Sequence, residues 1–129
     1  MAIAWQACRY LRSIIEEDMI AATRMLRLMS DDAEKDIAIR IFVPELANDK
    51  TWWCYYEIDW PEGTWKSRAG GVDSAQALFL AMQMIGSDIY TSSYHKSGKL
   101  FLDRPGEGYG FPVPSSLRGL LVGDDKKYL

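Results

Sequence analysis

The sequence predicts an α+β fold: an antiparallel sheet of about four strands, one long central helix packed on it, and an N-terminal accessory helix. Three patterns support this prediction. β-Branched residues alternate along residues 37–43, an aromatic-rich segment alternates along 52–60, and a long apolar helical pattern follows two glycines at 70–71. Strands that are followed by a helix in this way are typical of the α+β class.

The N-terminal segment has the spacing of an amphipathic helix. Apolar residues recur at helical intervals across residues 2–20, and Arg9, Arg12 and Glu16 occupy the remaining surface. These charges interrupt the apolar residues, so the segment has neither the apolar core of a signal peptide nor the ~20 apolar residues of a membrane span. We therefore expect a cytoplasmic protein without a membrane partner.

The next two segments have a two-residue period and predict an antiparallel hairpin. Leu26 and Leu28 flank Arg27, and the turn-forming residues 30–32 follow. Residues 37–43 then alternate as a strand does, until a proline stops the pattern.

The aromatic-rich segment 52–60 predicts a strand with one face in the core. The core face carries Trp52, Cys54, Tyr56, Ile58 and Trp60. The opposite face carries Trp53, Tyr55, Glu57 and Asp59. The second set grades from aromatic to acidic, as a half-solvated face would. A turn at 62–64 then leads into a fourth strand at 65–69.

The clearest local signal marks the start of the central helix. Asp73 is placed to act as the N-cap, and Gln76, three residues later, can reach back as in a capping box. This role explains Asp73 without a catalytic function. We expect the helix to end near Tyr90, with Gly86 only weakening it.

The central helix is apolar around most of its circumference. Its main stripe is predicted to consist of Ala75, Leu78, Met82, Ile85 and Ile89. Further apolar residues lie on both sides of this stripe, so the sheet alone cannot cover the helix. The N-terminal helix, the C-terminal tail or a second subunit must cover the rest. We expect a homodimer, or a monomer that dimerises when residues 1–22 are removed.

The whole chain, residues 1–129, is expected to fold as a single domain. Residues 1–22 would form a helical extension, 24–122 the α+β core and 123–129 a loose tail. Three short elements are expected after the central helix: a strand at 99–102, a Gly/Pro-rich loop at 103–114 and a helical turn at 115–121.

Composition and charge exclude several classes of function. The net charge of −3 and the pI near 5.1 give no field that would attract nucleic acid. The aromatic strand also has no basic residue between 51 and 61, unlike strands that stack RNA bases. Cys8, Cys54 and a single histidine are too few for a zinc site, so we expect no metal and no cofactor. Two buried, reduced thiols are expected, with a single disulfide bond as the alternative.

Two further motifs could bind a ligand but have a simpler interpretation. Glu57 and Asp59 share one strand face and could hold a metal or transfer protons, but without a third ligand we interpret them as part of a solvated outer face. Gly106, Gly108 and Gly110 alternate in a loop as in some phosphate sites. Prolines flank this loop and no helix follows it directly, so phosphate binding is not expected.

Four strings are specific when they are taken together: Ile58-Asp59-Trp60-Pro61, residues 71–78, Tyr94-His95-Lys96-Ser97-Gly98 and Gly108-Tyr109-Gly110-Phe111-Pro112. Through them the chain, from about residue 24 to 125, resembles a family of small uncharacterised bacterial proteins classed as a domain of unknown function. The resemblance implies no activity, cofactor or catalytic residue. The helix before residue 25 falls outside it.

The remaining candidate site lies in two loops. The segment 94–96 follows the central helix, and the loop 106–112 follows the short strand, so both are expected at the same end of the sheet. Together they would gather Tyr94, His95, Lys96, Arg104, Tyr109 and Phe111. This mixture of cationic, hydroxyl and aromatic groups suits a small anion or a peptide carboxylate. The alternative is that both segments are ordinary connecting loops.

We therefore expect a non-catalytic binding or protein-interaction module. The alternative is a small hydrolase or transferase-like enzyme in which His95 acts as a general base beside Tyr94 or Tyr109. Asp88 or Asp103 would then orient the imidazole.

Overall fold

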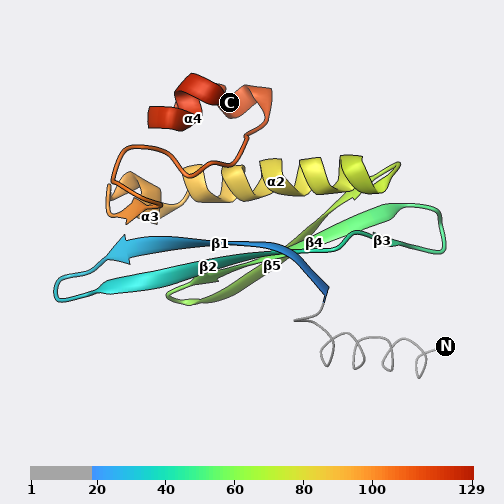
Figure 1. The fold of residues 1–129 in the computed structure, drawn as a ribbon, viewed down its shortest axis with the longest axis horizontal. Coiled ribbons are helices and arrows are strands. Elements are labelled where there is room, and N and C mark those ends of the chain that lie inside the picture. Colours follow the sequence, from blue (N-terminus) through green and yellow to red (C-terminus); the bar gives the residue numbers. More distant parts are fainter. Residues whose placement is uncertain (1–18) are drawn as a thin grey trace.

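The computed structural model describes residues 19–129, which form a sheet, a long helix across one face of it and a C-terminal segment above the helix (Figure 1). The predicted mixture of an antiparallel sheet and one main helix is confirmed. The accessory helix predicted over residues 2–20 lies outside the described residues except at its end. There, Ile20 already belongs to the first strand, so the helical extension does not reach residue 22.

The sheet has six strands, two more than predicted. They are β1 (Ile20–Met29), β2 (Glu34–Phe42), β3 (Glu45–Leu46), β4 (Trp52–Trp60), β5 (Gly63–Gly71) and β6 (Leu100–Phe101). The excess comes from β3 and β6, which are two residues long. β6 lies where a short strand was expected, whereas β3 lies in a segment without strand periodicity.

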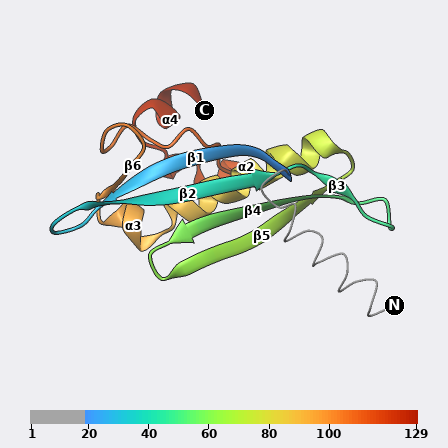
Figure 2. The same ribbon diagram turned by 60° about the horizontal axis from the view of Figure 1, so that its bottom comes forward.

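All strand pairs are antiparallel (Figure 2). β1 and β2 form the predicted hairpin. β5 pairs along the full length of β4 and with no other strand, so it forms one edge of the sheet. β2 and β3 pair with the opposite side of β4, and the short β6 forms the other edge beside β1.

The core lies between the sheet and α2 (Ser74–Tyr90). As predicted, β4 buries Cys54, Tyr56 and Ile58 on the face toward the helix. Cys54 is a free thiol whose pKa is raised to about 11 by burial, so it stays protonated at neutral pH. Cys8 lies outside the described residues.

The predicted N-cap is confirmed. Asp73 Oδ1 accepts a hydrogen bond of 2.8 Å from the Gln76 backbone N–H. The Gln76 side chain reaches back, as in a capping box, but accepts from the Val72 N–H at 2.7 Å instead of the N-cap N–H.

The buried stripe of α2 differs from the predicted one. The buried residues are Ala77, Ala81, Ile85, Gly86, Ile89 and Tyr90. Ala75 is exposed, and Leu78 and Met82 are only half-buried. The prediction centred the stripe on large residues, but the sheet already supplies large side chains, so small residues on α2 fill the remaining space.

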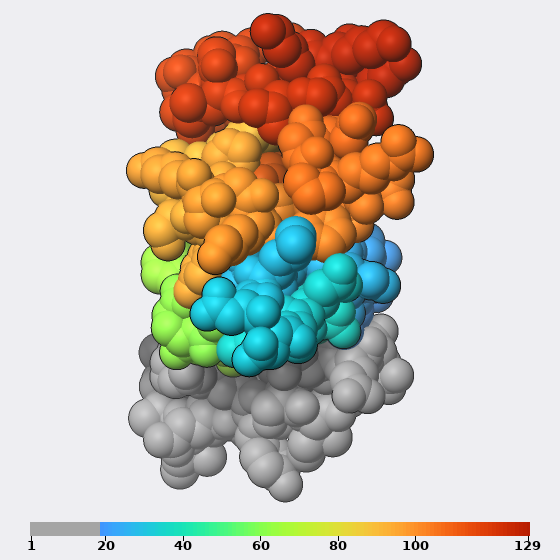
Figure 3. Space-filling view, turned by 90° about the vertical axis from the view of Figure 1, so that its left-hand side faces the viewer, coloured from blue at the N-terminus to red at the C-terminus, as the bar shows by residue number. Residues whose placement is uncertain are grey.

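The C-terminal segment covers the side of α2 that faces away from the sheet. It contains the 3₁₀ helix η2 (Ser115–Leu120) and α4 (Gly123–Tyr128) and follows α3 (Ser93–Lys96) and β6. Figure 3 shows it as the uppermost layer of the molecule. A Cβ atom on Gly86 would lie 1.9 Å from the Pro112 carbonyl oxygen, so glycine is required for this close approach. The expectation that Gly86 only weakens the helix is therefore wrong.

The expected loose tail after residue 122 is also wrong, because α4 is docked by a buried carboxylate. Asp125 is 2% exposed. It accepts hydrogen bonds from the Tyr90 hydroxyl at 2.5 Å and from the backbone N–H groups of Tyr109 and Gly110 at 2.8 Å each. These three donors compensate for its loss of water. A run of charged residues gave no sign of this contact in the sequence.

Candidate functional site

The structure brings His95 and Tyr109 together, from the two loops that the sequence placed at one end of the sheet. His95 Nδ1 lies 2.5 Å from the Tyr109 hydroxyl oxygen. Both rings contact Tyr90 edge to face, with ring centroids 4.8 and 5.3 Å apart. Burial raises the pKa of Tyr109 to about 12 and lowers the pKa of His95, so both groups are neutral at pH 7.

The other four predicted ligand-binding residues do not join this pair. Phe111 is buried, with the guanidinium carbon of Arg24 4.9 Å from its ring centroid. Tyr94 stacks on Trp60, with ring centroids 5.0 Å apart. The two remaining side chains, Lys96 and Arg104, are exposed.

The carboxylates expected to orient His95 are engaged elsewhere. Asp88 accepts a hydrogen bond from the Tyr56 hydroxyl, and Asp103 lies 4.0 Å from the Arg104 guanidinium. The Tyr90–His95–Tyr109 contacts join α2, α3 and the C-terminal segment. This is the arrangement of a packing cluster.

The glycine-rich loop binds the chain's own carboxylate. All three alternating glycines have positive φ angles, between 78° and 89°. A Cβ atom on Gly108 would lie 2.5 Å from the Asp125 carboxyl carbon. Because Asp125 already takes the N–H groups of Tyr109 and Gly110, the loop does not offer these donors to phosphate. Within residues 19–129, no group of His, Cys, Asp or Glu is arranged to hold a metal ion.

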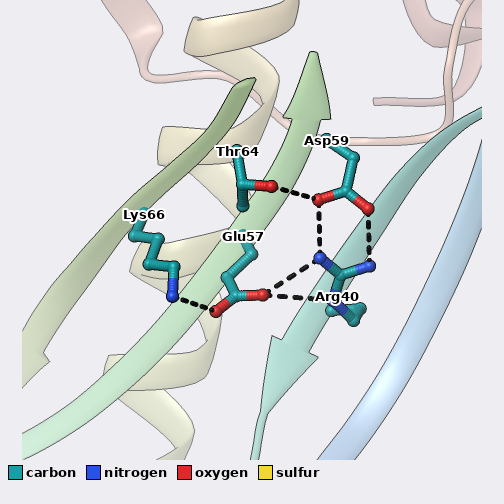
Figure 4. Close-up of polar contacts among 5 residues, drawn as sticks. All are labelled: Arg40, Glu57, Asp59, Thr64 and Lys66. Carbon is teal, nitrogen blue, oxygen red and sulfur yellow. Dashed lines mark hydrogen bonds and ion pairs between the residues drawn. The ribbon is translucent and has the colours of Figure 1, made fainter. Parts of the chain in front are cut away.

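The acidic pair on the outer face of the sheet belongs to an ion-pair network (Figure 4). The Arg40 guanidinium contacts Glu57 at 3.0 and 3.1 Å and Asp59 at 2.6 and 2.8 Å. Lys66 Nζ lies 3.4 Å from the second oxygen of Glu57, and Thr64 donates to Asp59 at 2.8 Å. The interpretation of a solvated face is wrong for Glu57, which is 8% exposed.

The electrostatics of this network favour the charged form of each partner. Hydrogen bonds from Arg40 lower the pKa of Asp59, and the two carboxylates raise the pKa of Arg40. The register explains the contact, because Arg40 lies directly opposite Glu57 in the β2–β4 pair. Both carboxylates therefore have cationic partners within the fold.

An open cleft of about 530 Å³ lies where the β4–β5 turn meets the end of α2 and α3. Figure 3 views this end of the molecule, with the β4–β5 turn in green below the helices in yellow and orange. Its lining consists of Trp60, Glu62, Gly63, Thr64, Trp65, Asp88, Thr91, Ser92, Ser93 and Tyr94. The lining therefore combines three aromatic rings, two carboxylates and several hydroxyl groups.

Three aromatic side chains, Trp60, Trp65 and Tyr94, line the cleft. Trp65 is 51% exposed although it lies opposite the buried Ile58 on the core side of the sheet. The Trp60 and Tyr94 rings stack nearly parallel, at 16° to each other. An exposed tryptophan beside a stacked aromatic pair gives the cleft a large apolar contact surface.

The two carboxylates of the cleft have no cationic partner among residues 19–129. Asp88 is half-buried, and burial raises its pKa, although hydrogen bonding by Tyr56 and Trp65 opposes the rise. Glu62 is exposed and accepts a hydrogen bond from the Tyr94 hydroxyl. The cleft therefore carries negative charge that the fold leaves unneutralised.

Sequence reasoning named only Tyr94 as a binding residue of this cleft, and Asp88 only as a partner of His95. Trp65 is the residue that could have indicated the cleft. The strand alternation places it on the core side of the sheet, but close to the end of an edge strand. In that position the Trp65 side chain is half exposed.

The fold and the cleft together define an α+β protein in which a helix-backed antiparallel sheet carries an open aromatic and acidic cleft at one end. The family described as "Domain of unknown function (DUF6968)" matches residues 22–113, and the chain belongs to this family. This confirms the resemblance read from the four strings. The matched segment contains the whole cleft and ends before η2 and α4. No curated protein and no solved structure matches the chain.

No helix in the described part of the chain is long and apolar enough to cross a membrane.

Proposed function

We propose that the protein is a non-catalytic binding module and that the cleft between the β4–β5 turn and the α2–α3 junction is its binding site. One observation carries the proposal: an exposed Trp65 stands beside a half-buried Asp88 that has no cationic partner among residues 19–129. Exposed apolar surface and desolvated charge both oppose folding. Their combination in one concave site is typical of ligand binding.

The catalytic alternative receives less support from the geometry. His95 Nδ1 is engaged by Tyr109, and Tyr109 is almost completely buried. A general base has to reach a substrate proton, and an activated nucleophile has to be accessible.

The homodimer stays a prediction. Its main premise was that α2 has more apolar surface than the sheet can cover. The C-terminal segment covers a large part of that surface, where Pro112 meets Gly86 and where Tyr90 bonds Asp125.

The proposed site can be tested by ¹⁵N chemical-shift mapping of the full chain with four probes: N-butylguanidinium, glucose, acetate and inorganic phosphate. We expect saturable shifts around residues 60–65 and 88–94 with at least one probe, because the cleft offers both aromatic and polar contacts. Trp65→Ala should abolish these shifts without unfolding the protein.

The matched control is Phe79→Ala. Phe79 is 53% exposed, close to the value for Trp65, but it lies on α2 outside the cleft lining. Its removal should leave the shifts unchanged. Saturable shifts confined to His95 and Tyr109, or none with any probe, would contradict the proposed site.

A further inference from the structure

We propose that the cleft selects ligands that carry an organic cation with N–H donors, namely an alkylguanidinium or alkylammonium group. This inference rests on the proposed binding function and adds the chemical class of the ligand. The cation could belong to a free small molecule or to an arginine or lysine side chain. Three features of the cleft support the inference, and each has a counterpart elsewhere in the same molecule.

The first feature is the sign of the charge. Asp88 and Glu62 are the charged residues that line the cleft in the described part of the chain, and no lysine or arginine lies among those lining residues. An anionic ligand would face two carboxylates without a compensating cation. A bound cation would supply for Asp88 what Arg40 supplies for Glu57 on the other face of the sheet.

The second feature is the hydrogen-bonding capacity of these carboxylates. An ionised carboxylate accepts about four hydrogen bonds. Asp88 accepts from the Tyr56 hydroxyl and is also hydrogen-bonded by Trp65, and Glu62 accepts from the Tyr94 hydroxyl. Guanidinium and ammonium groups provide several N–H donors that fit the remaining acceptor positions.

The third feature is the exposed indole ring. On the outer face of the same hairpin, the guanidinium carbon of Arg68 lies 3.7 Å from the ring centroid of Trp53. Trp65 lies on β5, as Arg68 does, but it faces the cleft. No cation among residues 19–129 lies over its ring. Because the face of an indole ring attracts cations, Trp65 is placed to form with a ligand the contact that Trp53 forms with Arg68.

The test compares N-butylguanidinium with N-butylurea, which has nearly the same shape but is uncharged and carries a carbonyl oxygen in place of one NH₂ group. Chemical-shift titration of the full chain should show saturable binding of N-butylguanidinium in the cleft, and binding of N-butylurea at least tenfold weaker. Equal affinity of the two probes in the cleft would overturn the cation inference and leave the binding function standing. If neither of them, nor glucose, acetate or phosphate, shifted the cleft residues, both proposals would fail.

Variants identify the groups responsible. Asp88→Asn keeps the shape of the side chain and should weaken N-butylguanidinium binding at least tenfold, with N-butylurea unaffected. The control is Asp103→Asn, which removes the same charge from an exposed loop residue outside the cleft and should change affinity less than twofold. Should Asp88→Asn not fold, the exposed Glu62→Gln provides the same comparison. Unchanged affinity in the folded variant would overturn the inference.

The source of the cation is distinguished by a blocked tripeptide, acetyl-Gly-Arg-Gly-amide, under the same conditions. Binding at least tenfold tighter than that of N-butylguanidinium supports an arginine side chain of a polypeptide, because the peptide backbone then adds contacts. Equal binding of the two supports a free small cation. Binding of the peptide that survives Asp88→Asn unchanged would count against the cleft as a cation site.

Discussion

The β4–β5 hairpin carries carboxylates in two different environments. On its outer face, Glu57 and Asp59 are neutralised by Arg40 and Lys66. In the cleft at its turn, Glu62 and the neighbouring Asp88 accept hydrogen bonds from tyrosine hydroxyls and form no ion pair within residues 19–129. The fold therefore supplies cationic partners for the first pair. For the second pair, our proposal is that a ligand supplies the cation.

The pKa shifts of Asp59 and Asp88 have opposite signs, so the charge of one carboxylate stabilises the folded state and the charge of the other destabilises it. The pKa of Asp59 is lowered, mainly by hydrogen bonds from Arg40, so the folded state favours its charged form. The pKa of Asp88 is raised, mainly by burial, so the folded state opposes its charge. A charge that opposes folding is expected where activity requires it.

The largest effect is expected from breaking the outer-face network. Arg40→Ala leaves the buried Glu57 with Lys66, at 3.4 Å, as its one cationic partner among residues 19–129. The change should lower the free energy of unfolding by about 2–3 kcal/mol at pH 7. Urea denaturation provides the measurement. Arg27→Ala is the control, because Arg27 and Glu34 form an exposed ion pair whose loss should cost about 0.5 kcal/mol or less.

The pH dependence should identify the charged groups involved. The pKa of Asp59 is depressed below its ordinary 3.8, so its contribution is complete above pH 3.8 and is lost as the pH falls through the folded-state pKa. The difference between the wild type and Arg40→Ala should therefore shrink in acid. A difference that stayed constant down to pH 2 would show that Arg40 acts through packing alone.

A smaller effect of opposite sign is expected in the cleft. The pKa of Asp88 is raised above its ordinary 3.8, so the protonated form favours folding. The contribution of Asp88 to stability is therefore complete below pH 3.8 and is lost as the pH rises through its folded-state pKa. Asp88→Asn removes this loss while its amide oxygen can still accept from Tyr56. At pH 7 the free energy of unfolding of Asp88→Asn should equal that of the wild type or be higher by up to about 1 kcal/mol. At pH 3 the two proteins should be equally stable.

Thermal unfolding at both pH values checks this prediction. A variant that is clearly less stable than the wild type at pH 7 would place Asp88 among the groups that support the fold, and the contrast with Glu57 would disappear.

Local patterns were sufficient to predict the hairpins and the cap of α2. Alternation along β2 and β4 identified their buried faces, and Asp73 with Gln76 marked the helix start, because these features depend on residues close together in sequence. The stripe of α2 was only partly correct, since the space between helix and sheet depends on both partners.

The cleft and the docked C-terminus could not be predicted in the same way. Trp65, Asp88 and Tyr94 meet only because α2 crosses the sheet and ends beside the β4–β5 turn. Similarly, the close approach of Pro112 to Gly86 depends on a return of the chain that leaves no local pattern. The prediction that the two candidate loops lie close together is confirmed for His95 and Tyr109. The residue types alone did not reveal that Tyr109 is buried in this contact.

The most direct test of the contrast between the two regions is an NMR titration of the aspartate and glutamate carboxyl groups with and without N-butylguanidinium. Without the cation, the Asp88 pKa should lie above 3.8 and the Asp59 pKa below it. A cation bound in the cleft favours the charged carboxylate, so saturating N-butylguanidinium should lower the Asp88 pKa and leave that of Asp59 unchanged. An Asp88 pKa that does not move, or equal shifts at Asp88 and Asp59, would contradict the assignment of the cleft as the binding site.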